Sequence, residues 1–104
     1  MQRHAFKMFL NPGMKAEYKK RHDEIWPELV TLLGDAGISN YSIHFDQESD
    51  MLFGYLERTE NHRMADLPQH PVLRKWWDYM KDIMKYNADG TPVAIAMDEL
   101  FHMK

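Results

Sequence analysis

The chain has no cysteine among its 104 residues and no basic run longer than Lys19-Lys20-Arg21. Without cysteine it forms no disulfide, cysteine-ligated zinc site, iron–sulfur cluster or thiol nucleophile. The formal net charge is −3, whereas nucleic-acid-binding proteins usually carry a basic face or stripe. We therefore expect no nucleic-acid partner.

The sequence also lacks a long apolar run. No segment approaches bilayer-spanning length, and the N-terminus shows neither an apolar signal core nor a small-residue cleavage site. We expect no membrane partner and a soluble protein of the cytoplasm. Hydrophobic residues make up 44% and charged residues 28% of the chain, as in a folded globular protein. This length supports one hydrophobic core, which predicts a single domain over residues 1–104.

Alternating apolar and polar residues predict the strands. Segments 3–10 and 39–46 show this pattern, segment 51–58 is predicted to be the partner strand of 39–46, and a last strand is expected over about 95–103. A polar turn separates the second and third segments, which predicts an antiparallel hairpin. Segment 51–58 is apolar on both faces, so both faces need cover. Helices would cover one face, and a second subunit the other.

A long first helix is expected between the first two strands. It should begin at Asn11-Pro12, with the asparagine as N-cap and the proline at the first helical position. Pro27 should kink it near Asp23, because proline removes one backbone donor and crowds the preceding turn. The helix should end at the glycines Gly34 and Gly37.

A second helical region follows the hairpin, from Thr59 or Glu60 onward. Pro68 and Pro71 break it, and a clearer helix is predicted over 71–85. The order of elements is then β-α-β-β-α-β. This order predicts an α+β fold of the ferredoxin-like type.

The candidate site begins with Tyr18, His22 and Trp26, which are spaced four residues apart. On a helix this spacing places a phenol, an imidazole and an indole in one row. A histidine gains or loses a proton near neutral pH, and aromatic rings with polar edges suit a flat polar ligand. The row therefore indicates a small-ligand pocket with one acid–base residue, His22.

Trp76 and Trp77 are adjacent in the predicted second helix. Neighbouring helical side chains point about 100° apart, so one indole should pack inward while the other lines a groove. Both could be core anchors, or one could stack on the C–H face of a sugar. Tyr41 in the second strand is either a core tyrosine or a hydroxyl that points into the cavity of His22.

The remaining histidines show no metal-site spacing, and no pair of acidic residues is fixed by spacing as a two-carboxylate glycosidase requires. The histidines are His4, His44, His62, His70 and His102. The chain also has no P-loop, no dinucleotide-binding glycine motif and no nucleophile-elbow motif. We expect neither a metal nor a cofactor.

The longest motifs are Tyr18-x3-His22-x3-Trp26-Pro27-Glu28-Leu29, Trp76-Trp77-x-Tyr79-Met80-x-Asp82-Ile83-Met84 and Asn87-x-Asp89-x-x-Pro92. These motifs resemble those of the L-rhamnose mutarotase family. The likeness runs essentially end to end. It implies a dimeric α/β barrel of ferredoxin-like subunits and an isomerase that interconverts the anomers of L-rhamnose without a cofactor.

By this resemblance His22 is the catalytic proton donor, and Tyr18, Tyr41, Trp76 and Trp77 contact the sugar. Other members of the family have tyrosine where this chain has His44 and His102. The group that accepts the second proton stays open among Tyr18, a water molecule and a carboxylate such as Glu99.

Two other readings of the same residues belong to different functional classes. One is a cofactor-free monooxygenase or haem-degrading protein on the same dimeric barrel. The other is a sugar-binding module in which His22 only hydrogen-bonds its ligand.

Overall fold

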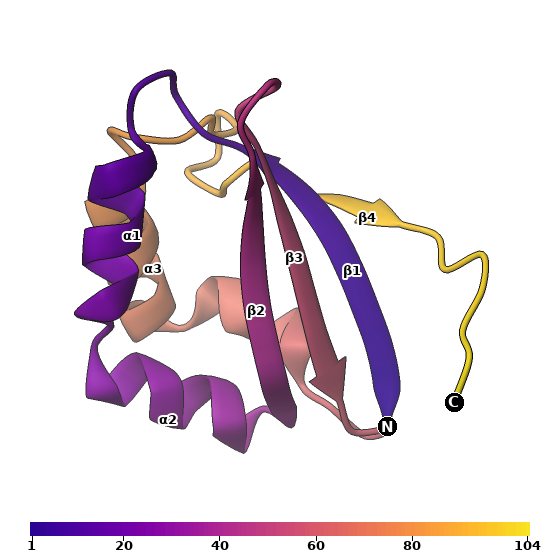
Figure 1. Ribbon diagram of the computed structural model, residues 1–104. Coiled ribbons are helices and arrows are strands. Elements are labelled where there is room, and N and C mark those ends of the chain that lie inside the picture. The colour runs from indigo at the N-terminus through magenta and orange to yellow at the C-terminus, as the bar shows by residue number, and fades with distance from the viewer.

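The computed structural model describes the whole chain, residues 1–104. Its elements are β1 (Gln2–Phe9), α1 (Lys15–Asp23), α2 (Pro27–Asp35), β2 (Ile38–Asp46), β3 (Met51–Arg58), a short 3-10 helix (Met64–Gln69), α3 (Pro71–Met80) and β4 (Ile95–Met97). The strands form one antiparallel sheet in the order β2-β3-β1-β4. All helices lie on one side of this sheet (Figure 1). The arrangement confirms the predicted ferredoxin-like β-α-β-β-α-β fold.

The hydrophobic core lies between the helices and the inner face of the sheet. Because strand side chains alternate, Phe6 and Met8 of β1 share this face with Leu52 and Leu56 of β3, and all four are buried. Gly54 lies directly opposite Phe6, and a side chain there would collide with the phenylalanine ring. The glycine therefore lets the Phe6 ring lie across β3.

The predicted first helix is wrong in form, because two separate helices occupy its place. α1 ends at Asp23 and Pro27 is the first residue of α2. A proline favours an extended conformation in the residue before it, and Trp26 has φ −66° and ψ 131°. The prediction that one helix carries Tyr18, His22 and Trp26 in a row is therefore wrong for Trp26, which lies outside α1.

The predicted helix start is also wrong. α1 begins at Lys15, and Met14 occupies the N-cap position without a side-chain cap. The Asn11 side chain instead donates to the backbone oxygen of Asp82 at 3.3 Å. Gly13 takes the left-handed φ of 81°, which turns the chain before the helix begins. Gly34 lies inside α2 rather than at its end, whereas Gly37 directly follows the C-cap Ala36 with φ 95° and ends the helix as predicted.

The C-terminal third is less regular than predicted. α3 stops at Met80, because residues 83–85 leave the helix to pair with the end of β1: Asn11 N–H donates to Ile83 O at 2.9 Å and Lys85 N–H to Phe9 O at 2.9 Å. β4 has three residues instead of the expected nine or so. The last seven residues form no helix or strand, and Leu100, Phe101 and Met103 are 93%, 81% and 78% exposed. None of the helices combines the length and apolar character needed to cross a membrane.

Candidate active site

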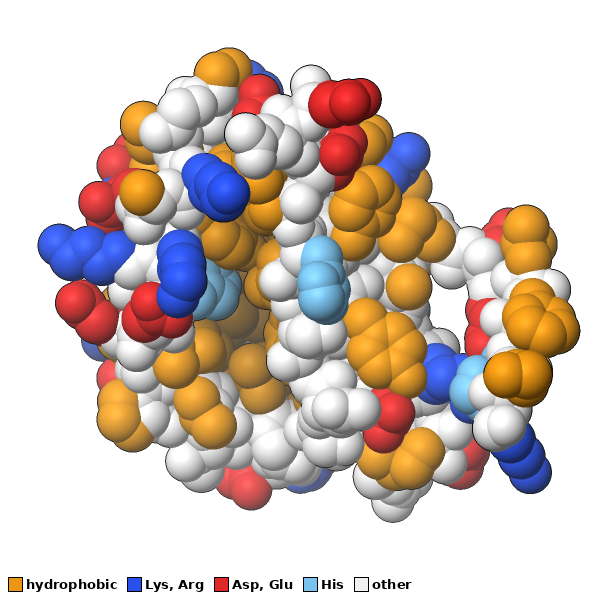
Figure 2. All heavy atoms as spheres, in the orientation of Figure 1, with side chains coloured by type: hydrophobic (Ala, Val, Ile, Leu, Met, Phe, Trp, Pro, Cys, Tyr) orange, Lys and Arg blue, Asp and Glu red, His pale blue; other side chains and the backbone are white.

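A cavity of about 1000 Å³ separates α1 from the inner face of the sheet. Figure 2 shows the hollow between the helices and the sheet, with hydrophobic walls and basic side chains at its rim. The rim includes Lys15, whose ammonium lies 5.6 Å from the centre of the Phe45 ring across the opening. It also includes Lys19, which pairs with Asp23 at 2.8 Å.

All five site residues predicted from the sequence line this cavity. α1 contributes Tyr18 and His22, β2 contributes Tyr41, and α3 contributes Trp76 and Trp77. Three elements far apart in the sequence thus converge on one space. Trp26 is outside the lining, because it packs behind Trp76 with the ring centroids 5.1 Å apart.

The His22 ring is fixed by α1 itself. Its Nδ1 lies 3.1 Å from the backbone oxygen of Tyr18, one turn earlier. A carbonyl can only accept, so Nδ1–H donates, and Nε2 carries the exchangeable lone pair or proton. Nε2 has no hydrogen-bond partner within the chain. Every fully buried polar side-chain atom in the structure has such a partner, so Nε2 is not fully buried. Because His22 lines the cavity, Nε2 is reachable from there.

Two aromatic rings surround the imidazole. Tyr18 stacks on it with centroids 4.2 Å apart and planes 25° apart. Trp76 meets it edge-on at 5.3 Å and 88°. Burial by these neighbours lowers the pKa of His22, and the bond to the Tyr18 carbonyl opposes that shift only in part. His22 is therefore a weaker base, and when protonated a stronger acid, than an exposed histidine.

The two tyrosines of the cavity remain protonated at neutral pH. Burial raises the pKa of Tyr18 well above its usual range and that of Tyr41 to about 12. Tyr41 lines the cavity, and its ring packs edge-on against Phe6 at 6.1 Å. Both hydroxyls can therefore donate and accept hydrogen bonds, but neither provides a phenolate base.

The adjacent tryptophans divide as their spacing predicts. Trp76 is buried and contacts both Trp26 and Tyr79, with centroids 5.1 and 5.7 Å away. Trp77 is only partly buried, and the guanidinium of Arg74 lies 5.5 Å from its ring centre. Trp76 is a core anchor that also touches His22, and Trp77 lines the cavity with part of its side chain exposed.

Comparison with known proteins gives one consistent result. Residues 3–103 match the family model described as L-rhamnose mutarotase. A relative named L-rhamnose mutarotase from Sinorhizobium fredii is 63% identical over 103 residues, covering 99% of each chain. Another of that name from Rhizobium meliloti is 60% identical over 104 residues, covering 100% of each.

The chain belongs to the L-rhamnose mutarotase family. A crystal structure of an L-rhamnose mutarotase from Formosa agariphila agrees, with a TM-score of 0.93 and 46% identity over the full length of both chains. The family resemblance of the sequence motifs is thereby confirmed. Neither the monooxygenase or haem-degrading alternative nor the sugar-binding module gains support from these comparisons.

For a mutarotase the second proton-transfer group also matters, and Glu99 is not close enough to serve within this chain. Its carboxylate accepts two hydrogen bonds from Arg3, at 2.9 and 3.2 Å. Arg3 pairs with Glu57 on the outer face of the sheet and does not line the cavity. The structure thus separates Glu99 from His22 by the thickness of the sheet.

Sequence reasoning missed two other histidines that line the cavity of this mutarotase-family protein, His4 and His44. His4 stacks on Phe6 at 5.4 Å, and burial lowers its pKa. The alternation of β1 could have found it, because His4 shares the strand face of Phe6 and Met8. His44 lies on edge strand β2. No three His, Asp or Glu side chains come together as a metal site requires.

The lowered pKa values of His4 and His22 predict that stability falls on mild acidification. Below a pH of about 6.5 the unfolded histidines take up protons that the folded chain resists, so the free energy of unfolding decreases. It should be constant above this pH and fall as the pH approaches the lower folded-state pKa values. Urea unfolding at several pH values measures this, and His4→Gln with His22→Gln should flatten the curve. Stability that rose on acidification to about pH 5.5 would contradict the assignment.

Proposed function

We propose that the chain interconverts the α and β anomers of L-rhamnose, with His22 as the catalytic proton donor. The observation that carries this proposal is the position of His22: its free Nε2 is reachable from an aromatic cavity while its Nδ1 is fixed to the Tyr18 carbonyl. A 6-deoxyhexose, at roughly 30 Å³ for each of its about eleven non-hydrogen atoms, takes up at most about 330 Å³. The cavity of about 1000 Å³ admits it with water.

The reaction needs one proton delivered and one removed. Protonated Nε2 gives its proton to the ring oxygen, the bond from C1 to that oxygen breaks, and the O1–H proton leaves as C1 becomes an aldehyde. Rotation about C1–C2 presents the other carbonyl face, and the reverse transfers close the ring and return the proton to His22. Positioned proton transfer of this kind contributes about 10²–10⁴-fold to the rate.

Water is the proposed acceptor of the O1 proton. The hydroxyls of Tyr18 and Tyr41 stay protonated because burial raises both pKa values, so they suit hydrogen bonds to sugar hydroxyls better than proton abstraction. Trp76 and Trp77 line the same wall and offer ring surfaces to the C–H face and the methyl group of the sugar. No step calls for a metal or coenzyme, since neither electrons nor groups are transferred.

Saturation-difference NMR tests the proposal directly. Irradiation of one anomeric proton of L-rhamnose should reduce the signal of the other only when the protein is present. Methyl α-L-rhamnopyranoside has a blocked O1 and should compete without exchanging. Binding of both sugars with no acceleration of exchange would leave only the sugar-binding module.

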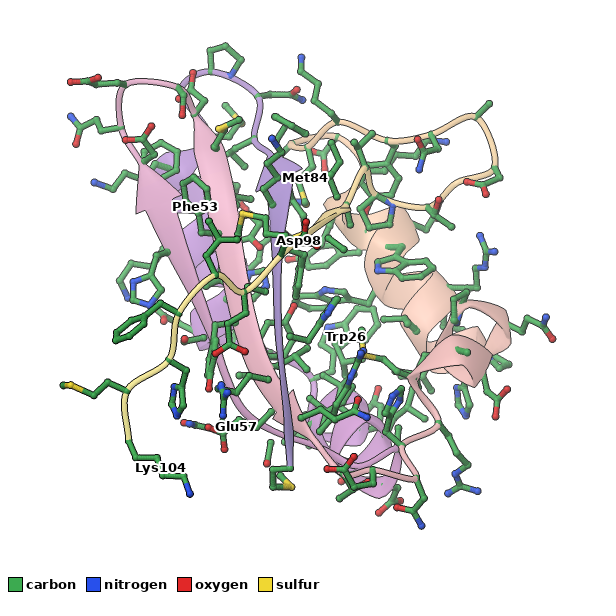
Figure 3. The ribbon with its side chains drawn as sticks, turned by 90° about the vertical axis from the view of Figure 1, so that its right-hand side faces the viewer. Trp26, Phe53, Glu57, Met84, Asp98 and Lys104 are labelled. Carbon is green, nitrogen blue, oxygen red and sulfur yellow. The ribbon has the colours of Figure 1, made fainter.

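We further infer that the protein is a homodimer formed through the outer face of the sheet. This face carries Phe9 of β1, Met51, Phe53 and Tyr55 of β3, and Ile95 of β4, and no helix covers it. Figure 3 views it, with Phe53 and Glu57 on β3 and the chain from Asp98 to Lys104 crossing in front of the sheet. A second copy would bury these side chains and complete the dimeric α/β barrel.

Sedimentation equilibrium should give about twice the 12.4 kDa of the chain. Phe53→Glu should shift the mass toward one chain, because it places a charge in the proposed interface. A wild-type protein that sediments as one chain would rule the dimer out.

We also propose that residues 1–104 act as a single domain with one cooperative unfolding transition, and that the protein works in the cytoplasm.

A further inference from the structure

Arg21 directly precedes His22 in α1 but does not line the cavity. Its side chain is only 11% exposed, although it carries a permanent charge. Such burial of a guanidinium requires partners for its donors. Those partners come from two different parts of the chain.

One partner lies within α1 and the others at the end of α3. Within α1, Nε donates to Glu17 at 2.8 Å. Towards α3, Nη1 and Nη2 donate to the two carboxylate oxygens of Asp82 at 2.8 and 3.2 Å, and Nη1 also donates to the Tyr79 backbone oxygen at 2.7 Å. The guanidinium also lies 4.6 Å from the centre of the Tyr79 ring. Two N–H groups of the Arg21 guanidinium thus bond to the two carboxylate oxygens of Asp82. This bidentate geometry fixes the orientation of the guanidinium as well as its distance from the carboxylate.

A continuous series of contacts leads from Arg21 back to the catalytic ring. Tyr79, held under the guanidinium, packs against Trp76 at 5.7 Å, and Trp76 meets the His22 ring at 5.3 Å. α1 borders the cavity and is not closely packed against any strand. The bonds of Arg21 join α1 to α3 beside the edge contact of His22 with Trp76.

We propose that Arg21 is a positioning residue for the mutarotase reaction, which clamps α1 to the end of α3 so that His22 is held edge-on to Trp76. This inference rests on the proposed function of His22. The clamp acts through orientation more than through stability, because the Asp82 side chain is 69% exposed and exposed ion pairs stabilise little. A misplacement of about 1 Å at a catalytic group can reduce the rate about 10²-fold.

The chain offers a matched control for this clamp. Arg3 also makes a two-bond pair with a carboxylate, Glu99, at 2.9 and 3.2 Å, but on the other side of the sheet. Arg21→Lys and Arg3→Lys therefore remove the same kind of fork while keeping the charge. Asp82→Asn weakens the inter-helix half of the Arg21 network, and Glu17→Gln weakens only the half within α1.

We expect Arg21→Lys to lower kcat for anomer exchange about tenfold or more, with KM changed less than about threefold. Asp82→Asn should show a smaller loss of the same kind, while Arg3→Lys and Glu17→Gln stay within about twofold of wild type. An NMR titration of the His22 ring gives a second readout. In Arg21→Lys the pKa of His22 should rise toward the usual value of about 6.5, because the ring gains water as it leaves Trp76.

Equal kcat values for Arg21→Lys and Arg3→Lys, or an effect on KM alone, would overturn the inference. So would an unchanged His22 titration in Arg21→Lys. If Arg21→Lys did not fold, Asp82→Asn decides, because its exposed carboxylate is not part of the core. A wild-type protein that does not accelerate exchange contradicts the proposed function, and the titration of His22 in the variants would still test the clamp.

Discussion

Replacing His22 by alanine is expected to slow anomer exchange of L-rhamnose about 10²–10⁴-fold, the usual contribution of a positioned acid or base. The loss should appear in kcat, because the imidazole supplies a proton that water supplies less well. Saturation-difference NMR at matched protein concentration measures the exchange rate.

The control for this variant is His102→Ala. His102 lies outside the cavity, in the C-terminal segment, 3.9 Å from Glu99. Its removal should leave exchange unchanged. Methyl α-L-rhamnopyranoside should still bind to His22→Ala, because the tyrosines and tryptophans of the wall remain. An unimpaired exchange rate in His22→Ala would remove His22 from the mechanism.

Truncation of Trp76 should have the largest effect on stability. Its indole is 6% exposed and contacts His22, Trp26 and Tyr79. Trp76→Ala should therefore lower the free energy of unfolding by about 3–5 kcal/mol, as for other buried aromatic side chains. Urea denaturation monitored by circular dichroism gives the value.

The neighbouring tryptophan provides the comparison. Trp77 is partly exposed, so Trp77→Ala should be distinctly less destabilising and should mainly weaken sugar binding. Trp76→Phe should recover part of the lost stability, since it restores an aromatic ring in the same space. Equal losses of unfolding free energy in Trp76→Ala and Trp77→Ala would show that the assignment of Trp76 as core anchor and Trp77 as cavity wall is wrong.

The residue pattern predicted the fold well where the local signal was strong. The apolar segment 51–58 predicted β3 with the same bounds, Met51–Arg58, and one face of β1 and β3 is buried in the core, with Phe6, Met8, Leu52 and Leu56. Tyr18 and His22 do share a helix face, since the ring of one stacks on that of the other at 4.2 Å. In each case the side chains concerned are near neighbours in one regular element, whose periodicity fixes their direction.

The wrong predictions concern segments whose bonds and contacts are made with residues far away in the sequence. Asn11 was expected to cap a helix, but its backbone and side chain bond to Ile83 and Asp82 instead. The same pairing ended α3 early. Trp26 does not lie in a row with Tyr18 and His22, because Pro27 starts a new helix. It packs on Trp76 of α3 instead. Such choices depend on partners dozens of residues away, which local propensity does not contain.

The sequence by itself determined the order of elements, the imidazole one turn after a tyrosine, and the family motifs. Only the tertiary structure decided that α1 and α3 border one cavity, that Trp76 rather than Trp77 meets His22, and that Glu99 lies behind the sheet. The physical reason is that helical and strand periods fix which way a side chain points from its own element. The distance between elements is set by packing and by inter-helix bonds such as those of Arg21 with Asp82.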